Sequence, residues 1–157
     1  MLRIMLAVLL ALALVQASAS AMAGNRLVGT WKSDSEASLR GVRSQAGLTR
    51  DQVRMIEQVV GQMTMSFTDK RLKVTMPDIN VVLNDRTVEL YGDEREVSYQ
   101  VVRDQPELMA VKVVGLEYGE DTVEYHFEGN DLFWVYSDSM QGIAGDTRVR
   151  EYFRRVK

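Results

Sequence analysis

The chain has 157 residues, of which 46% are hydrophobic and 26% are charged, and its formal net charge at pH 7 is −3. This composition is typical of one globular domain, and the acidic balance argues against nucleic acid as a partner, because phosphate binding needs a basic face. Cysteine is absent and histidine occurs once. Disulfides, thiolate nucleophiles and cysteine-based metal sites are therefore excluded.

The first 23 residues differ in character from the rest of the chain. Arg3 precedes an unbroken apolar run over 4–15, which is shorter than the ~18 residues that span a bilayer and is typical of a secretory signal. Small residues at alternate positions follow, and we expect cleavage after Ala23. The processed domain, 24–157, is then expected in the periplasm or outside the cell, with no membrane span.

Two short helices are predicted, over 34–46 and 50–62. Ser33 and Glu36 have the spacing of a capping box, in which the two residues satisfy each other's free amide groups at a helix start. Thr49, with a glutamine three residues later, repeats this pattern at the second helix. Apolar residues then recur at helical spacing along the second helix.

Elsewhere apolar and polar residues alternate, which is the pattern of half-buried strands joined in hairpins. The predicted strands are, in chain order, 27–32, 63–67, 72–76, 97–101, 109–113, 123–127, 132–136 and 148–156. The segment 79–91 adds up to two more. An antiparallel meander of eight to ten strands usually closes, because closure removes exposed sheet edges. We therefore predict a mainly β protein, a single antiparallel up-and-down barrel with a helical insertion after the first strand.

Three short motifs carry a family resemblance. Gly29-Thr30-Trp31, on the first strand, resembles the G-x-W signature of the calycins, which include the lipocalins and the intracellular fatty-acid-binding proteins. The helix pair resembles the lid of the fatty-acid-binding branch, and Arg150-Glu151-Tyr152 resembles the R-x-Y that holds a ligand carboxylate there. With its export signal, the chain looks most like the bacterial lipocalin-like proteins. It lacks the lipocalin disulfides, and its middle strands do not match the fatty-acid-binding strands residue by residue.

The resemblance implies a structural role for four residues. Gly29 belongs to the signature, and Trp31 would plug the closed end of the barrel. A basic side chain of the last strand, Arg154 or Arg155, would stack on the indole, a contact that contributes about 0.5–2 kcal/mol.

The resemblance also implies a ligand site inside the barrel. Arg150 and Tyr152 share one face of the last strand, and they would grip a carboxylate if that face points inward. The alternative places Val149, Glu151 and Phe153 inside and leaves the arginines in solvent. The expected wall of the cavity consists of Met65, Phe67, Val74, Tyr99, Val111, Tyr125 and Trp134.

The other candidate groups do not indicate a catalytic site, a cofactor site or a metal site. His126 lies on the polar face of its strand, and no serine is set in a G-x-S-x-G sequence. The acid pairs Asp93-Glu94 and Glu120-Asp121 are expected in turns and lack the spacing of a calcium loop. We therefore expect a protein that is not an enzyme.

Two functions remain open on the sequence. The first is a secreted or periplasmic binding protein for a small apolar or amphipathic molecule, with a carboxylate as an option and the helices as a lid. The second is a barrel filled by its own side chains, which acts as an interaction or inhibitor module through its outer surface. Eight strands enclose enough room for one small ligand or for side chains alone, so the volume of the cavity separates the two.

Overall fold

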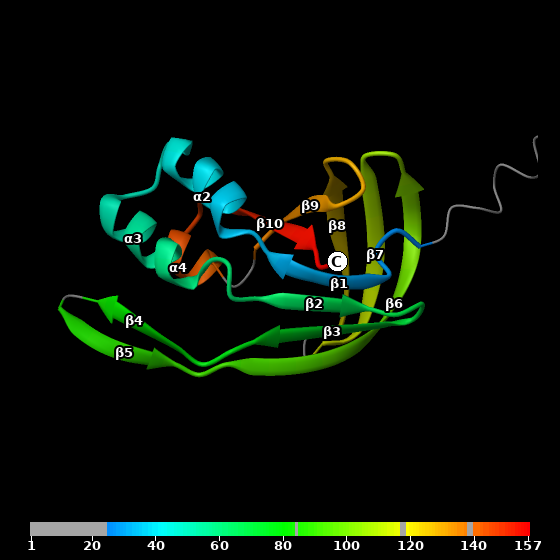
Figure 1. Ribbon diagram of the computed structural model, residues 1–157, viewed down its shortest axis with the longest axis horizontal. Helices are drawn as coiled ribbons and strands as arrows, with labels where there is room; N and C mark the ends of the chain where they lie inside the picture. Colours follow the sequence, from blue (N-terminus) through cyan, green and yellow to red (C-terminus); the bar gives the residue numbers. More distant parts are fainter. Residues whose placement is uncertain (1–24, 84, 117–118, 138–139) are drawn as a thin grey trace, which may run out of the picture.

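The computed structural model describes residues 25–83, 85–116, 119–137 and 140–157, so the predicted signal segment 1–23 lies outside the described part of the chain. Eight strands form a closed antiparallel barrel in the order β1-β10-β9-β8-β7-β6-β3-β2, and β4 and β5 form a separate two-stranded sheet (Figure 1). The predicted fold class, a single up-and-down barrel with a helical insertion after the first strand, is confirmed.

The predicted elements are present with shifted ends, and a short helix, α4, was not predicted. The elements are β1 (Gly29–Ser33), α2 (Ser35–Ser44), α3 (Arg50–Val59), β2 (Thr64–Phe67), β3 (Arg71–Met76), β4 (Ile79–Leu83), β5 (Arg86–Leu90), β6 (Asp93–Gln105), β7 (Leu108–Leu116), β8 (Gly119–Phe127), β9 (Leu132–Tyr136), α4 (Gln141–Ala144) and β10 (Arg150–Arg155). Both acid pairs therefore belong to strands, β6 and β8, and the prediction that they lie in turns was wrong.

One end of the barrel is packed with aromatic side chains. Trp31 is fully buried, and its ring centroid lies 4.6 Å from that of Phe133 and 6.2 Å from that of Phe127. Phe153 stacks on Phe133 at 5.4 Å. These contacts fill the interior around Trp31 and close this end of the barrel.

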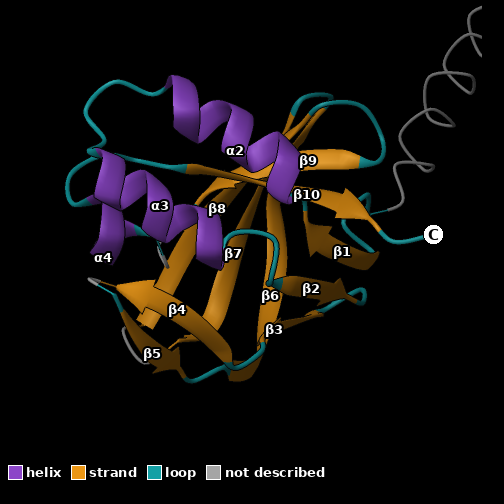
Figure 2. Cartoon of the chain, turned by 60° about the vertical axis from the view of Figure 1, so that its left-hand side comes forward, coloured by secondary structure: helices purple, strands orange, loops and turns teal. Residues whose placement is uncertain are grey.

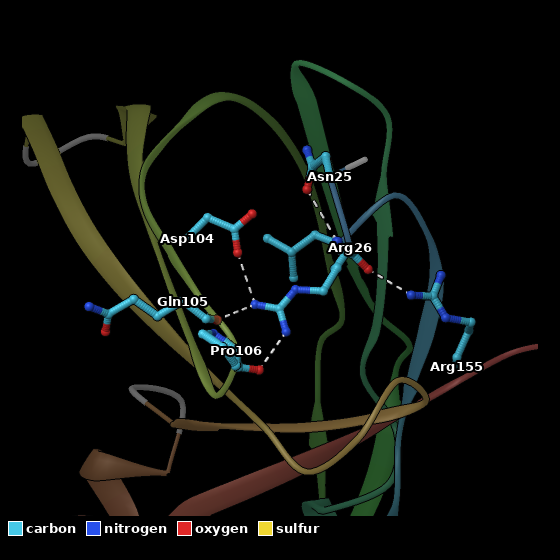
Figure 3. Close-up of polar contacts among 7 residues, drawn as sticks. Asn25, Arg26, Asp104, Gln105, Pro106 and Arg155 are labelled. Atoms are coloured by element: carbon cyan, nitrogen blue, oxygen red, sulfur yellow. Dashed lines mark hydrogen bonds and ion pairs between the residues drawn. The ribbon is translucent and has the colours of Figure 1, made fainter. Parts of the chain in front are cut away.

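The segment before β1 covers the same end. Leu27 is fully buried, and Arg26 reaches across to the end of β6, where it pairs with the Asp104 carboxylate at 2.9 Å, and to the turn that follows, where it donates to the Pro106 carbonyl at 2.6 Å (Figure 3). Arg155 in β10 donates to the Arg26 carbonyl at 2.6 Å. The two arginines thus tie the start of the domain to both a distant turn and the last strand.

The three helices of the described residues, α2, α3 and α4, gather at the opposite end of the barrel, beside the β4–β5 hairpin (Figures 1 and 2). They share a second, smaller core with the segment just before β10, formed by Val42, Ile56, Val60, Met140, Ala144 and Val149. At the start of α2 the Asp34 amide donates to the Tyr152 carbonyl at 2.7 Å, and the Ser38 hydroxyl accepts from the Tyr152 amide at 2.9 Å. These bonds continue the edge of β10 where β1 has ended.

The two helix starts differ in how well they were predicted. The capping box of Thr49 and Gln52 is confirmed, with both reciprocal hydrogen bonds present. The box of Ser33 and Glu36 was wrong, because Asp34 caps α2 by accepting from the Ala37 amide at 3.0 Å. Ser33 instead ends β1 with its side chain inside the barrel.

The β4–β5 hairpin leaves the barrel at a close crossing. A Cβ atom on Gly92 would lie 2.2 Å from the carbonyl oxygen of Met76 and 2.7 Å from the amide nitrogen of Asp78, both backbone atoms that cannot rotate away. Gly92 also donates its amide to the Asp78 carboxylate at 2.6 Å. Only glycine allows the two segments to cross at this distance.

We therefore expect Gly92→Ala to lower the free energy of unfolding by about 1–3 kcal/mol, as overpacked sites do. Gly41→Ala is the matched control, since nothing lies within 4 Å of a Cβ at this position in the middle of α2. That control should gain about 0.5–1 kcal/mol from its better helix propensity. Chemical denaturation measures both variants, and an equal response would contradict the assigned crossing.

Candidate functional site

The interior is hollow toward the end that carries the helices. A cavity of about 220 Å³ opens there, and Arg95, whose side chain is 57% exposed, stands at its rim. Seven strands or their flanking residues contribute the wall, and most of it is aliphatic. The lining residues are Met63, Met65, Leu72, Val74, Arg95, Val97, Val113, Val123, Tyr125, Val135, Tyr136, Ser137 and Glu151.

The predicted wall residues divide into three groups. Met65, Val74 and Tyr125 line the cavity. Phe67, Tyr99 and Val111 point inward but belong to the packed core of the barrel. Trp134 was wrongly placed on the wall, because it lies on the outer face of β9, where its neighbours Phe133 and Val135 take the inward positions.

Glu151 brings a carboxylate into this apolar interior. The residue is 2% exposed, and its pairing partner on the neighbouring strand β9 is Val135. Ser33 donates its hydroxyl to Oε1 at 2.6 Å, and Ser137 donates to Oε2 at 2.9 Å. Ser33 is itself fixed in place, because its hydroxyl oxygen accepts from the Gly61 amide at 2.9 Å.

The environment of Glu151 opposes its ionisation. Burial raises the pKa of the Glu151 carboxyl, and the hydrogen bonds from Ser33 and Ser137 offset this only in part. Among the described residues, no lysine or arginine forms a hydrogen bond or ion pair with Glu151. Burial also raises the pKa of Tyr125 on the same cavity, so its phenol stays neutral.

Arg150 and Tyr152 do not enter the barrel, so the carboxylate grip implied by the resemblance is not formed in the interior. Arg150 is exposed with its guanidinium 4.3 Å from the centre of the Trp134 ring, and the Tyr152 hydroxyl donates to Glu128 at 3.3 Å. The reason is the alternation of β10, in which Glu151 and Phe153 are buried and Arg150 and Arg154 are exposed. This is the second of the two alternatives stated for the last strand.

The outer face of β8, β9 and β10 therefore carries a row of stacked rings and cations, which we call the outer aromatic row: His126, Trp134, Tyr136, Arg148 and Arg150. His126 lies on the outer face as predicted, stacked on Trp134 at 3.8 Å. Burial against this ring lowers the pKa of His126, an effect that the nearby Glu124 opposes and Arg150 reinforces. Arg148 covers Tyr136 at 3.7 Å.

The residues expected to have a structural role are in contact at the packed end. The guanidinium of Arg155 lies 4.2 Å from the centre of the Trp31 ring, which settles the choice between the two arginines of the last strand. Arg154 instead pairs with Asp34 at 2.8 Å. Gly29 adopts a φ of +126°, and a Cβ there would lie 2.9 Å from Nη1 of Arg155.

Within the described residues, no group of three or more histidine or acidic side chains could hold a metal ion. The Glu94 carboxylate pairs with Lys73 at 2.8 Å, and the Asp93 carboxylate pairs with Arg95. No described helix is both long and apolar enough to cross a membrane.

No family model, curated protein or solved structure matches this chain. The closed eight-stranded antiparallel barrel is compatible with a calycin-like fold. What the barrel could bind is therefore inferred from its own residues.

Proposed function

We propose that the protein is an exported calycin-like binding protein that takes a small, mostly apolar molecule into the open end of its barrel. The observation that carries this proposal is the cavity of about 220 Å³ with its largely aliphatic wall. An apolar cavity of roughly 150 Å³ is enough to hold benzene in another protein. The volume here suits a ligand somewhat larger than a benzene ring.

The partial burial of the wall supports the same proposal. Met63, Val74 and Val123 pack against the barrel core but are only partly buried, because they face the cavity. A ligand that covered them would gain about 25 cal/mol for each Å² of apolar surface removed from water. The aromatic end of the barrel leaves no comparable surface, so binding belongs to the open end.

The interior of the barrel does not support a ligand that carries a carboxylate, which the sequence left open. The acid-binding pair lies outside, and the group that faces the cavity is itself a carboxylate, Glu151. A ligand anion beside it would meet a like charge or a neutral acid in a low-dielectric wall. We therefore favour ligands without a carboxylate.

One observation favours the alternative of an interaction module. The outer aromatic row is a partly exposed surface, and within the part of the chain that the structure describes neither Arg148 nor Arg150 forms an ion pair with an acidic side chain. Aromatic rings and arginine are enriched at protein interfaces. This function would need no hollow barrel.

A filled-cavity variant distinguishes the two functions. Toluene should raise the melting temperature of the wild-type protein by mass action, and Val123→Trp, which places an indole in the cavity, should abolish that shift. Val114→Trp is the matched control, because Val114 is 45% exposed on the outer face of the neighbouring strand β7. Equal shifts in the wild type and Val123→Trp would reject binding in this cavity and leave the interaction module.

A further inference from the structure

Glu151 is unusual for a side chain that lines an apolar cavity. It is 2% exposed and faces a largely aliphatic wall, yet its two hydrogen-bond partners, Ser33 and Ser137, are neutral. Among the described residues that line the cavity, Arg95 is the one basic residue, and it stands at the rim, paired with Asp93. The interior thus contains an acid that the described residues provide with no counter-charge.

The hydrogen-bonding capacity of Glu151 is only partly used. A carboxylate can accept about four hydrogen bonds, and the two serine hydroxyls supply one to each oxygen. The remaining positions suit N–H or O–H donors. An ionised carboxylate that is buried without a cation is costly, whereas one that meets a cation in good geometry recovers much of that cost.

From this arrangement we propose that the ligand of the barrel is an organic amine, whose ammonium group pairs with Glu151 while its hydrocarbon body packs against the cavity wall. The proposal rests on the binding function proposed above and names its ligand class. Met65, Val74 and Val123 supply apolar contacts around the acid, and the volume of about 220 Å³ suits a primary amine of about the size of benzylamine.

The other titratable groups on the cavity do not compete for this role. Tyr125 is a phenol, the ring of Tyr136 lies in the outer aromatic row, and Arg95 is a cation that would repel an ammonium group at the rim. The two hydroxyl donors hold the Glu151 carboxylate in a fixed orientation, so little side-chain freedom is lost when a ligand binds. Glu151 therefore determines both the position and the charge of the ligand head group.

Four ligands of one size test the proposal by titration calorimetry at pH 7: toluene, benzyl alcohol, benzylamine and benzoate. Toluene measures the cavity alone, and the other three add a neutral donor, a cationic donor and an anion. Each is titrated into the full-length protein, into Glu151→Gln, and into Glu96→Gln. The last variant changes the net charge equally but alters an exposed acid on β6 that pairs with Arg71 on the outer face.

We expect benzylamine to bind the wild type and Glu96→Gln at least tenfold more tightly than toluene or benzyl alcohol, and benzoate to bind most weakly. Glu151→Gln should lose the amine preference and keep its affinity for toluene, which also shows that this variant is folded. Toluene binding without an amine preference would overturn the inference and leave the binding function intact. An amine preference that survives in Glu151→Gln would also overturn it, whereas no binding of toluene or benzylamine to any variant would reject the binding function itself.

Discussion

Replacement of Trp31 with alanine is expected to lower the free energy of unfolding by about 3–5 kcal/mol, the usual range for a large aromatic side chain deleted from a core. Trp31 is fully buried and packs against Phe127 and Phe133. Its indole N–H donates to the Leu27 carbonyl at 2.7 Å, and Arg155 covers the ring at 4.2 Å. Alanine would leave a cavity, an unpaired carbonyl and a cation without its aromatic face.

The second tryptophan of the chain provides the control. Trp134 lies on the outer face of β9, where it contacts His126, Tyr136 and Arg150 and remains partly exposed. We expect Trp134→Ala to cost about 1 kcal/mol, the scale of a single stacking or cation–aromatic contact. Denaturant unfolding of both variants is the measurement, and a similar cost for the two would contradict the assignment of Trp31 to the closed end.

The barrel could be predicted because its local signals agree with one another. Hairpins such as 63–76 alternate strictly, with apolar residues on one face and polar residues on the other, so each strand has one inward side. The observed inward positions in this hairpin include Met65, Phe67 and Leu72, which are buried. Closure then follows, because the first strand pairs with both the last and the second.

The alternation of apolar and polar residues does not determine which way Trp134 points, because every residue of its strand is apolar or aromatic. In the sequence of β9, Leu-Phe-Trp-Val-Tyr, either face could be the inner one. The structure places Phe133 and Val135 inside, since they stand opposite Phe153 and Glu151 of β10. The choice depends on the register between two strands, which one strand alone does not contain.

The buried acid was missed for a different reason. The motif resemblance assigns the ligand site to Arg150 and Tyr152. Glu151 faces inward only in the alternative interpretation of the last strand, which named no site residue. The signal that could have found it is Phe153, an aromatic residue two positions from Glu151 on the same face. The serine that holds the carboxylate, Ser33, lies 118 residues earlier, a contact that only the closed barrel creates.

The cavity itself lies beyond what sequence reasoning can supply. Its volume depends on where seven strand segments stop packing against one another, and methionine or valine fills a core as readily as it lines a pocket. The same eight strands could enclose a ligand or side chains alone. The structure shows both outcomes in one barrel, with aromatic packing at the end near Trp31 and a hollow at the end near Glu151.

Glu151 is expected to make a contribution to the stability of the protein that falls as the pH rises above about 4.5, the ordinary pKa of a glutamate. Burial raises the pKa of this carboxyl in the folded state, so between 4.5 and the raised value the native protein binds more protons than the unfolded chain does. Within that window the contribution of Glu151 to the free energy of unfolding decreases with pH, by up to about 1.4 kcal/mol for each pH unit, and it levels off above the window.

Glu151→Gln isolates this effect, because an amide of the same shape does not titrate. The difference in unfolding free energy between the wild type and Glu151→Gln, measured by denaturation from pH 4 to pH 8, should move in favour of the variant as the pH rises. Asp34→Asn is a control of opposite sign. Burial alone would raise the pKa of Asp34, but the Ala37 amide and Arg154 together lower it, so its contribution is lost as the pH falls.

The slopes of these two difference curves must therefore have opposite signs if Glu151 is buried without a counter-charge. A flat curve for Glu151→Gln would show that the carboxylate is solvated or already paired with a cation in the folded protein. In that case the acid would impose no penalty on the empty barrel, and an amine would gain nothing by meeting it. Repeating the wild-type series with benzylamine present should reduce the decline above pH 4.5, because a bound ammonium group favours the ionised carboxylate in the folded state.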